Sequence, residues 1–331
     1  MLINKIVIWG HQLHDHTHSY IHNGFFRGFN YLGYKTYWFS DLEENISKLD
    51  FNNSLFIVHG LMSKYLPINE NSFYVIHNTE MKTSNEKTIF FNSINQTAIP
   101  VKNIVNLQVY TKDCINRDKK DPNNKYHYYL EPPSQIIYFP WATDLLPEEI
   151  DENIINLDNT KNLDNNKINS NPEVNFIGMI LECWLPVREY CIKNNIKFNH
   201  YGGTFDINSP NNKSTLENQE LIQKSIVAPT IVGEWQKNIN YIPCRIFKNI
   251  SYGKMGLTNS KAIAELFDNK ILYSDNITEL LDKGMEFEKN PNKNEIVKEL
   301  MEEVRDKHTY VNRCNYILDY LKKYFNIQIE K

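Results

Sequence analysis

Two series of short apolar segments, alternating with amphipathic ones, constrain the fold of this 331-residue chain more than any other feature. The first series comprises "KIVIW" (5–9), "SLFIVHG" (54–60), "FYVIHN" (73–78) and "IIYFPWATD" (136–144). Residues 19–34, between the first two of these segments, place their apolar side chains on one helical stripe. Strand-like segments separated by helical ones are typical of parallel strands joined by crossover helices. The first half therefore predicts an α/β fold with a parallel sheet.

A second alternating series follows a polar, Asn- and Asp-rich stretch at 151–172, which predicts a linker or surface loop. This series again alternates strand-like with helical segments, and the chain ends in a long amphipathic helical region. We therefore predict an N-terminal domain, a linker, a C-terminal domain and a C-terminal helix that packs back towards the first domain, spanning residues 1–150, 151–172, 173–305 and 306–331. Because parallel sheets bind ligands beyond the carboxyl ends of their strands, we expect two domains that face a central cleft.

The segment "GHQLHDHTHS" (10–19) holds four of the ten histidines of the chain, and it joins the first strand to the first helix. It is compatible with a metal site, with a proton-transfer site, or with a polar loop without chemistry. Metallo-β-lactamase-type hydrolases carry H-x-H-x-D-H after a strand, and His11, Asp15 and His16 match that pattern. Leu13 replaces its second histidine, and the chain lacks the β-sandwich pattern of that fold. We therefore predict that no metal is bound and that the segment serves proton transfer.

The segment "NYIPCRIFKNISYGKMGLTNS" (240–260) predicts a helix with a proline near its start, followed by a short strand. Arg245 and Lys248 are three residues apart and therefore share one face of that helix. Helix N-termini favour anions, and arginine and lysine are the cations that hold phosphate groups. The segment is therefore compatible with a diphosphate site, or with a solvated helix face that carries two cations.

The stretch "RIFKNISYGKMGLTNS" resembles the donor-binding helix and strand of glycosyltransferases with the GT-B fold, in which R-x-F-E-A-x-A-x-G is common. Arg245 and Gly253 match this pattern, whereas Lys248 stands at its acidic position. "FPWATDLLPEEI" (139–150) and "HTYVNRCNYIL" (308–318) resemble two further segments of bacterial and viral relatives, of the glycosyl transferase family 1/4-like type. The resemblance covers nearly the whole chain and implies an α/β protein of two Rossmann-like domains.

The resemblance further implies a nucleotide-sugar-dependent glycosyltransferase that needs no metal or other cofactor. Arg245 and Lys248 would stabilise the leaving diphosphate. The other implied donor contacts are Tyr241, Asn249, Tyr252, Asn259, Ser260, Gly178 and Glu234. Lys248 at the acidic position argues for inversion, which requires a general base beside the acceptor hydroxyl. We expect that base to be Asp15 or His16, with His14 beside them, and the acceptor to contact His11, His18, His77 and Glu80.

The net charge, the cysteine content and the length of the apolar runs indicate which partners and which cellular location to expect. The formal net charge is −4, so no basic field favours nucleic acid, and we expect a glycan or small-molecule acceptor. Five cysteines without a CxxC pair predict reduced thiols in the cytoplasm. No apolar run reaches the roughly 18 to 20 residues of a membrane span. The alternative functions are a non-catalytic GT-B-like module that binds a glycan or protein, and a metal-dependent hydrolase that uses the histidine-rich loop.

Overall fold

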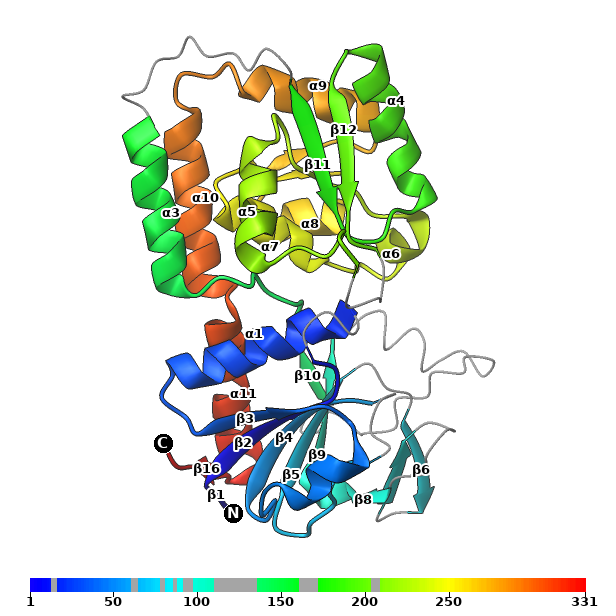
Figure 1. Cartoon of the computed structure of the whole chain (residues 1–331), viewed down its shortest axis with the longest axis vertical. Coiled ribbons are helices and arrows are strands. Elements are labelled where there is room, and N and C mark those ends of the chain that lie inside the picture. Colours follow the sequence, from blue (N-terminus) through cyan, green and yellow to red (C-terminus); the bar gives the residue numbers. More distant parts are fainter. Residues whose placement is uncertain are drawn as a thin grey trace. The chain divides into compact units, whose positions relative to one another are not determined.

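The computed structural model describes residues 1–12, 17–60, 65–77, 81–85, 88–91, 98–109, 136–160, 172–203 and 209–331. The chain divides into two compact units (Figure 1). Unit 1 combines Met1–Pro140 with Tyr310–Lys331, and unit 2 comprises Trp141–Thr309.

Unit 1 is built on a six-stranded parallel sheet with the order β10-β9-β5-β4-β2-β3. Its strands are β2 (Lys5–Trp9), β3 (Thr36–Phe39), β4 (Ser54–His59), β5 (Phe73–His77), β9 (Ile104–Gln108) and β10 (Ile136–Tyr138). Every residue of β4 and β5 is buried, as continuous apolar runs in a parallel sheet require. The strand segments expected from the first apolar series therefore all contribute to one sheet.

Two helices of unit 1, α1 (Thr17–Tyr31) and α11 (Tyr310–Phe325), pack against each other. Gly24 and Gly28 lie one turn apart on α1, and a Cβ atom at Gly24 would lie 2.3 Å from the ring of Tyr310. The missing side chains therefore allow the close approach of the two helices. Other elements of the unit are η1 (Glu43–Ser47), η2 (Val101–Asn103), the parallel pair β1 (Leu2–Ile3) and β16 (Gln328–Ile329), and the antiparallel sheet of β6 (Met81–Asn85), β7 (Thr88–Phe91) and β8 (Ala98–Pro100).

Unit 2 contains five parallel strands in two described groups. They are the pair β11 (Glu173–Ile177) and β12 (Lys197–Tyr201), and the sheet β13 (Pro229–Thr230), β14 (Leu257–Thr258) and β15 (Leu272–Tyr273). Its helices are α3 (Pro147–Thr160), η3 (Glu182–Trp184), α4 (Leu185–Lys193), α5 (Thr215–Lys224), α6 (Glu234–Asn238), α7 (Cys244–Ser251), α8 (Lys261–Leu266), α9 (Ile277–Phe287) and α10 (Lys293–Lys307). A continuous hydrophobic core contains buried residues of β11, β14 and every helix named here except α6.

The linker prediction for 151–172 is wrong over its first ten residues, because helix α3 extends to Thr160. Ile150, Ile154 and Leu157 follow a helical spacing and pack in the core of unit 2. The abundance of Asn and Asp in this stretch masked that apolar stripe. Residues 161–171, the rest of the predicted linker, lie outside the described part of the chain.

The long helical region at the C-terminus consists of two helices, α10 and α11. His308 and Thr309 separate them, and the boundary between the two units falls directly after Thr309. Within unit 2, the backbone N–H of Thr143 donates to the His308 carbonyl at 3.0 Å, and Thr143 forms a parallel bridge with Thr309. These extended-chain contacts explain why the helix stops there. Among the described residues, none of the helices combines the length and the apolar character that crossing a membrane demands.

Candidate functional site

Three histidines meet at the carboxyl edge of the sheet in unit 1. His59 and His77 are the last residues of β4 and β5, and the register of these strands pairs them with each other. His11 follows β2, which is the neighbour of β4 on its other side. Because parallel strands end at the same edge of a sheet, the fold brings together residues that are up to 66 positions apart in the chain.

Helix α1 adds two more histidines, His18 and His22, which are four residues apart and share one helix face. His22 Nδ1 lies 3.1 Å from the carbonyl oxygen of Gly10, and His22 Nε2 lies 2.9 Å from Nε2 of His77. A carbonyl only accepts hydrogen bonds, so Nδ1 of His22 carries the proton. A neutral His22 then accepts from His77 at Nε2. We call His11, His18, His22, His59 and His77 the histidine cluster.

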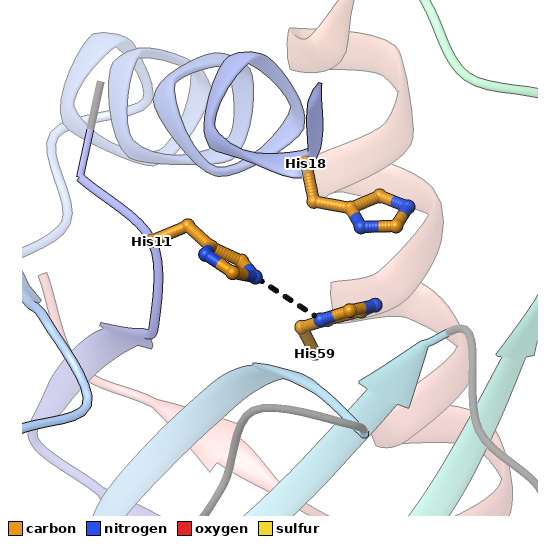
Figure 2. Close-up of side chains that lie close together, drawn as sticks. All are labelled: His11, His18 and His59. Carbon is orange, nitrogen blue, oxygen red and sulfur yellow. Dashed lines mark hydrogen bonds between the residues drawn. The ribbon is translucent and has the colours of Figure 1, made fainter. Parts of the chain in front are cut away.

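The other three members of the histidine cluster, His11, His18 and His59, converge as a second group (Figure 2). Each offers one ring nitrogen, and these three nitrogens all lie within 4.8 Å of one another. His11 Nε2 and His59 Nδ1 are 3.3 Å apart, and the ring centroids of His18 and His59 are 4.1 Å apart. His11 and His59 are buried, whereas His18 is half-buried.

Electrostatics favours a neutral ring at His77, the member of the histidine cluster at the end of β5. Burial, together with the charge that the four other histidines would carry, holds the pKa of His77 well below its usual value. An imidazole that stays neutral at physiological pH has a nitrogen lone pair available to accept a proton or bind a metal ion. The cluster is thus suited to proton transfer and to metal ligation.

The structure brings the predicted residues His11, His18 and His77 together, and it adds His22 and His59, which the sequence reading did not select. Two signals could have found them. His59 closes the apolar segment "SLFIVHG", and His22 follows His18 by one helical turn. The predicted residues His14, Asp15, His16 and Glu80 lie outside the described residues, so their roles remain predictions.

Arg245, on helix α7 of unit 2, is held at the carboxyl end of β11. Its Nη2 donates to the carbonyl oxygen of Ile177 at 3.1 Å. The guanidinium carbon lies 4.4 Å from the ring centroid of Phe176 and 5.5 Å from that of Trp184. Burial lowers the pKa of Arg245, but a guanidinium remains protonated at neutral pH. The structure thus fixes a cation at a strand end, where parallel sheets bind ligands.

Gly178 follows β11 and lies directly beside Arg245. Its φ of +126° is a conformation that side chains rarely adopt, and a Cβ atom here would lie 2.9 Å from Nη2 of Arg245. Glycine is therefore required both by the backbone and by the approach of the guanidinium. The predicted residues Gly178 and Arg245 belong to one site.

Lys248 has surroundings different from those of Arg245. Its Nζ lies 2.9 Å from Oδ2 of Asp144, and the hydroxyl of Tyr252 donates to Oδ1 of Asp144 at 2.7 Å. The Asp144 side chain is 4% exposed, and burial together with this carboxylate raises the pKa of Tyr252 well above its usual value. Two of the predicted donor contacts, Lys248 and Tyr252, are therefore engaged by a buried acid that the sequence reading did not identify.

The remaining predicted donor residues divide into buried and accessible ones. Asn249 donates to the carbonyl of Ala228 at 2.8 Å. Asn259 accepts from the N–H of Val232 at 2.9 Å and donates to its carbonyl at 3.0 Å. Both amides are buried and hold the backbone around β13 and β14, and their contact with a donor stays a prediction. Ser260 is buried at the start of α8, and Tyr241 is half-buried before α7. Glu234 is exposed on α6, and its Oε1 lies 3.1 Å from Nζ of Lys237.

No family model matches the chain, and no curated protein matches it. Among solved structures, it is similar to an alpha-glucosyltransferase in complex with UDP and a 13-mer DNA containing a HMU base. One structure of that complex is 10% identical to this chain, with a TM-score of 0.57, and the match covers 96% of this chain and 99% of that one. A second structure is 11% identical, with a TM-score of 0.58 and coverage of 96% and 98%. An alpha-glucosyltransferase in complex with UDP is 9% identical, with a TM-score of 0.53 and coverage of 95% and 98%.

This likeness shows the fold. The chain is an α/β protein with two Rossmann-like domains of the GT-B type, as its sequence predicted. The narrower label of a glycosyl transferase family 1/4-like protein stays a prediction, because no family model matches.

Proposed function

We propose that the protein is a glycosyltransferase that moves a sugar from a nucleotide-diphosphate sugar to a hydroxyl group. The observation that carries the proposal is Arg245, a cation fixed at a strand end by the Ile177 carbonyl and by two aromatic rings. The shared fold supports it, because the similar alpha-glucosyltransferase was solved with UDP.

Arg245 is the residue that would stabilise the leaving diphosphate. Its planar guanidinium offers several N–H donors to phosphate oxygens, and its contacts with Phe176 and Trp184 reduce the entropy lost on binding. Gly178 lets this guanidinium approach the strand end, because a Cβ atom there would lie 2.9 Å from Nη2 of Arg245. Arg245 lies in the first turn of α7, where the partial positive charge of the helix adds to its own. We assign this role to Arg245 alone, because Lys248 is paired with Asp144.

Proton removal from the acceptor is assigned to unit 1. Asp15 remains the proposed general base, with His16 and His14 as its neighbours. Within the histidine cluster, His77 is kept neutral by burial and could accept the proton in turn. His11, His18 and His77, together with Glu80, remain the proposed acceptor contacts.

Inversion of the anomeric centre is part of the proposal. Many retaining relatives of the kind that the sequence resembles hold the donor with an acid at the position of Lys248. In this chain the position is Lys248, whose Nζ is paired with Asp144, an acid that also accepts from Tyr252. The similar solved protein is named an alpha-glucosyltransferase, so the anomeric outcome needs its own test. Proton NMR of the first product formed distinguishes inversion from retention of the donor configuration.

The donor would be bound without a metal ion on its diphosphate, because Arg245 supplies the charge. Donor affinity should therefore persist in the presence of a chelator. The proposed acceptor is a glycan or small molecule in the cytoplasm. The similar alpha-glucosyltransferase was solved with DNA, so the acceptor screen includes nucleic acids despite the net charge of −4.

Isothermal titration with UDP, GDP and dTDP, followed by their sugar conjugates, is the first experiment. We expect one nucleotide to bind, and its sugar conjugate to release a nucleoside diphosphate when an acceptor is present. Absence of binding to every nucleotide would contradict the proposal. Binding without turnover on any acceptor would instead favour the non-catalytic binding module.

A further inference from the structure

We propose that His11, His18 and His59 form a binding site for one Zn²⁺ ion in unit 1 (Figure 2). One ring nitrogen from each residue lies within 4.8 Å of the other two. The three side chains come from three different elements, the segment after β2, the start of α1 and the end of β4. The site goes beyond the proposed glycosyl transfer and does not depend on it.

The spacing of the ring nitrogens fits tetrahedral coordination. Zinc–nitrogen bonds of about 2.0–2.1 Å in a tetrahedron place neighbouring nitrogens about 3.3–3.4 Å apart. His11 Nε2 and His59 Nδ1 are already 3.3 Å apart, which is the length of one edge of such a tetrahedron, and the metal ion would replace the proton of the hydrogen bond between them. The third nitrogen, from His18, lies within 4.8 Å of the other two, so each of its separations has to shorten by at most about 1.5 Å. His18 is half-buried, so its side chain can shift without unpacking the core.

The ligand set selects the kind of metal ion. Imidazole nitrogen suits Zn²⁺ and its first-row neighbours, whereas Mg²⁺ and Ca²⁺ require oxygen ligands. Three histidines leave one tetrahedral position for a water or a substrate oxygen, which is the arrangement of catalytic rather than closed structural zinc sites. Mg²⁺ therefore serves as the negative control for the same protein.

Contacts around the proposed site support two of its three ligands, His11 and His59. His22 bonds to the carbonyl of Gly10, which precedes His11, and also to His77, which is the strand neighbour of His59. Two members of the histidine cluster thus brace the segments that carry two of the ligands. Supports of this kind typically change metal affinity by 10- to 100-fold when they are removed.

The proposed ligands differ from those of the H-x-H-x-D-H pattern that the sequence matches only in part. The pattern H-x-H-x-D-H draws its first ligands from one loop, and Leu13 breaks it here. The proposed site takes one ligand from that loop, and its other two from α1 and β4. The proposed site is an alternative to the prediction that no metal is bound, and the titration below decides between the two.

The test uses the full chain without a polyhistidine tag, stripped of metal and then titrated with Zn²⁺ alone. Calorimetry should give one site per chain, and Co²⁺ should give the visible absorption of a tetrahedral site. His59→Ala and His18→Ala should each weaken Zn²⁺ binding at least tenfold, and His22→Ala should weaken it less. His200→Ala, an exposed histidine of unit 2, is the matched control and should bind like the parent protein.

Circular dichroism of each metal-free variant establishes that it is folded. If His59→Ala does not fold, His18→Ala decides the question, because its side chain is the least buried of the three. The proposal is overturned if the parent protein does not bind Zn²⁺, or if His59→Ala and His18→Ala both bind Zn²⁺ with the affinity of the parent protein. Titration needs neither donor nor acceptor, so failure here leaves the glycosyltransferase proposal intact, and loss of nucleotide binding leaves this site intact.

Discussion

The two units place very different chemistry at the same kind of position, the carboxyl ends of parallel strands. Unit 1 gathers five imidazoles, and burial together with its four neighbours lowers the pKa of His77. Unit 2 fixes a permanently charged guanidinium beside Gly178. Neutral nitrogens accept protons or bind metal ions, whereas a guanidinium binds anions. The shared architecture therefore determines where each site lies, and the side chains determine what it can bind.

The two sites also differ in how their groups are held. Histidines of unit 1 bond to one another, so removal of one ring disturbs its neighbours. Arg245 is held by a backbone carbonyl and by two aromatic rings, which remain in place when the arginine is removed. We therefore expect substitutions in unit 2 to separate ligand binding from stability more cleanly.

The largest expected effect is on donor binding by Arg245→Ala. Loss of the cation should weaken binding of the nucleotide by about 100-fold, equivalent to about 2.7 kcal/mol. Arg245→Lys should recover only part of this affinity, because lysine lacks the planar fork. Calorimetry measures both variants, with Arg188→Ala, an exposed arginine on α4, as the control. Unchanged affinity in Arg245→Ala would place the diphosphate elsewhere.

Lys248→Met should lower the free energy of unfolding by about 2–3 kcal/mol, because Asp144 would remain buried without its cation. Its effect on donor affinity should stay below about threefold. Chemical denaturation and calorimetry check the two quantities. Lys261→Met removes a lysine whose side chain is 76% exposed and should change stability by less than about 0.5 kcal/mol. A large loss of donor affinity in Lys248→Met would restore the two-cation prediction.

Gly24→Ala tests the packing of unit 1, away from its strand ends. The added methyl group would lie 2.3 Å from the ring of Tyr310, so α1 and α11 would have to separate. We expect a loss of about 2 kcal/mol in stability, with nucleotide affinity unchanged. Thermal and urea unfolding measure it against Asn30→Ala, an exposed position on the same helix. Equal stability of the two variants would show that the helices can adjust.

Gly178→Ala and Gly33→Ala form the final and most closely matched pair. Both glycines have positive φ, +126° and +84°, so both substitutions should cost about 1–2 kcal/mol of stability. Only Gly178 lies against Arg245, since nothing lies within 4 Å of a Cβ atom at Gly33. Only Gly178→Ala should therefore weaken nucleotide binding, by about tenfold, or about 1.4 kcal/mol. Equal nucleotide affinity of the two variants would contradict the link between Gly178 and the donor site.

Much of the fold could be predicted from the sequence, because buried parallel strands consist of continuous apolar runs. "KIVIW" corresponds to β2 residue for residue, and "SLFIVHG" and "FYVIHN" each extend one residue beyond their strand. Helix α3 was missed because its apolar stripe is thin and its other positions are Asn, Asp and Glu. The division predicted after residue 305 did not locate the break at His308 and Thr309, because neither residue forbids a helix and contacts with Thr143 end α10.

By itself, the sequence determined the two α/β series and the four histidines that follow the first strand. It also determined that Arg245 lies near the start of a helix. Tertiary structure decided which side chains meet. His59 and His77 reach His11 only because β4 lies between β2 and β5, and strand order is not encoded in local periodicity. Spacing placed Arg245 and Lys248 on one helix face, but Asp144, 104 residues before Lys248 in the chain, separated their roles. Local patterns specify elements, whereas long-range packing selects the partners of each polar group.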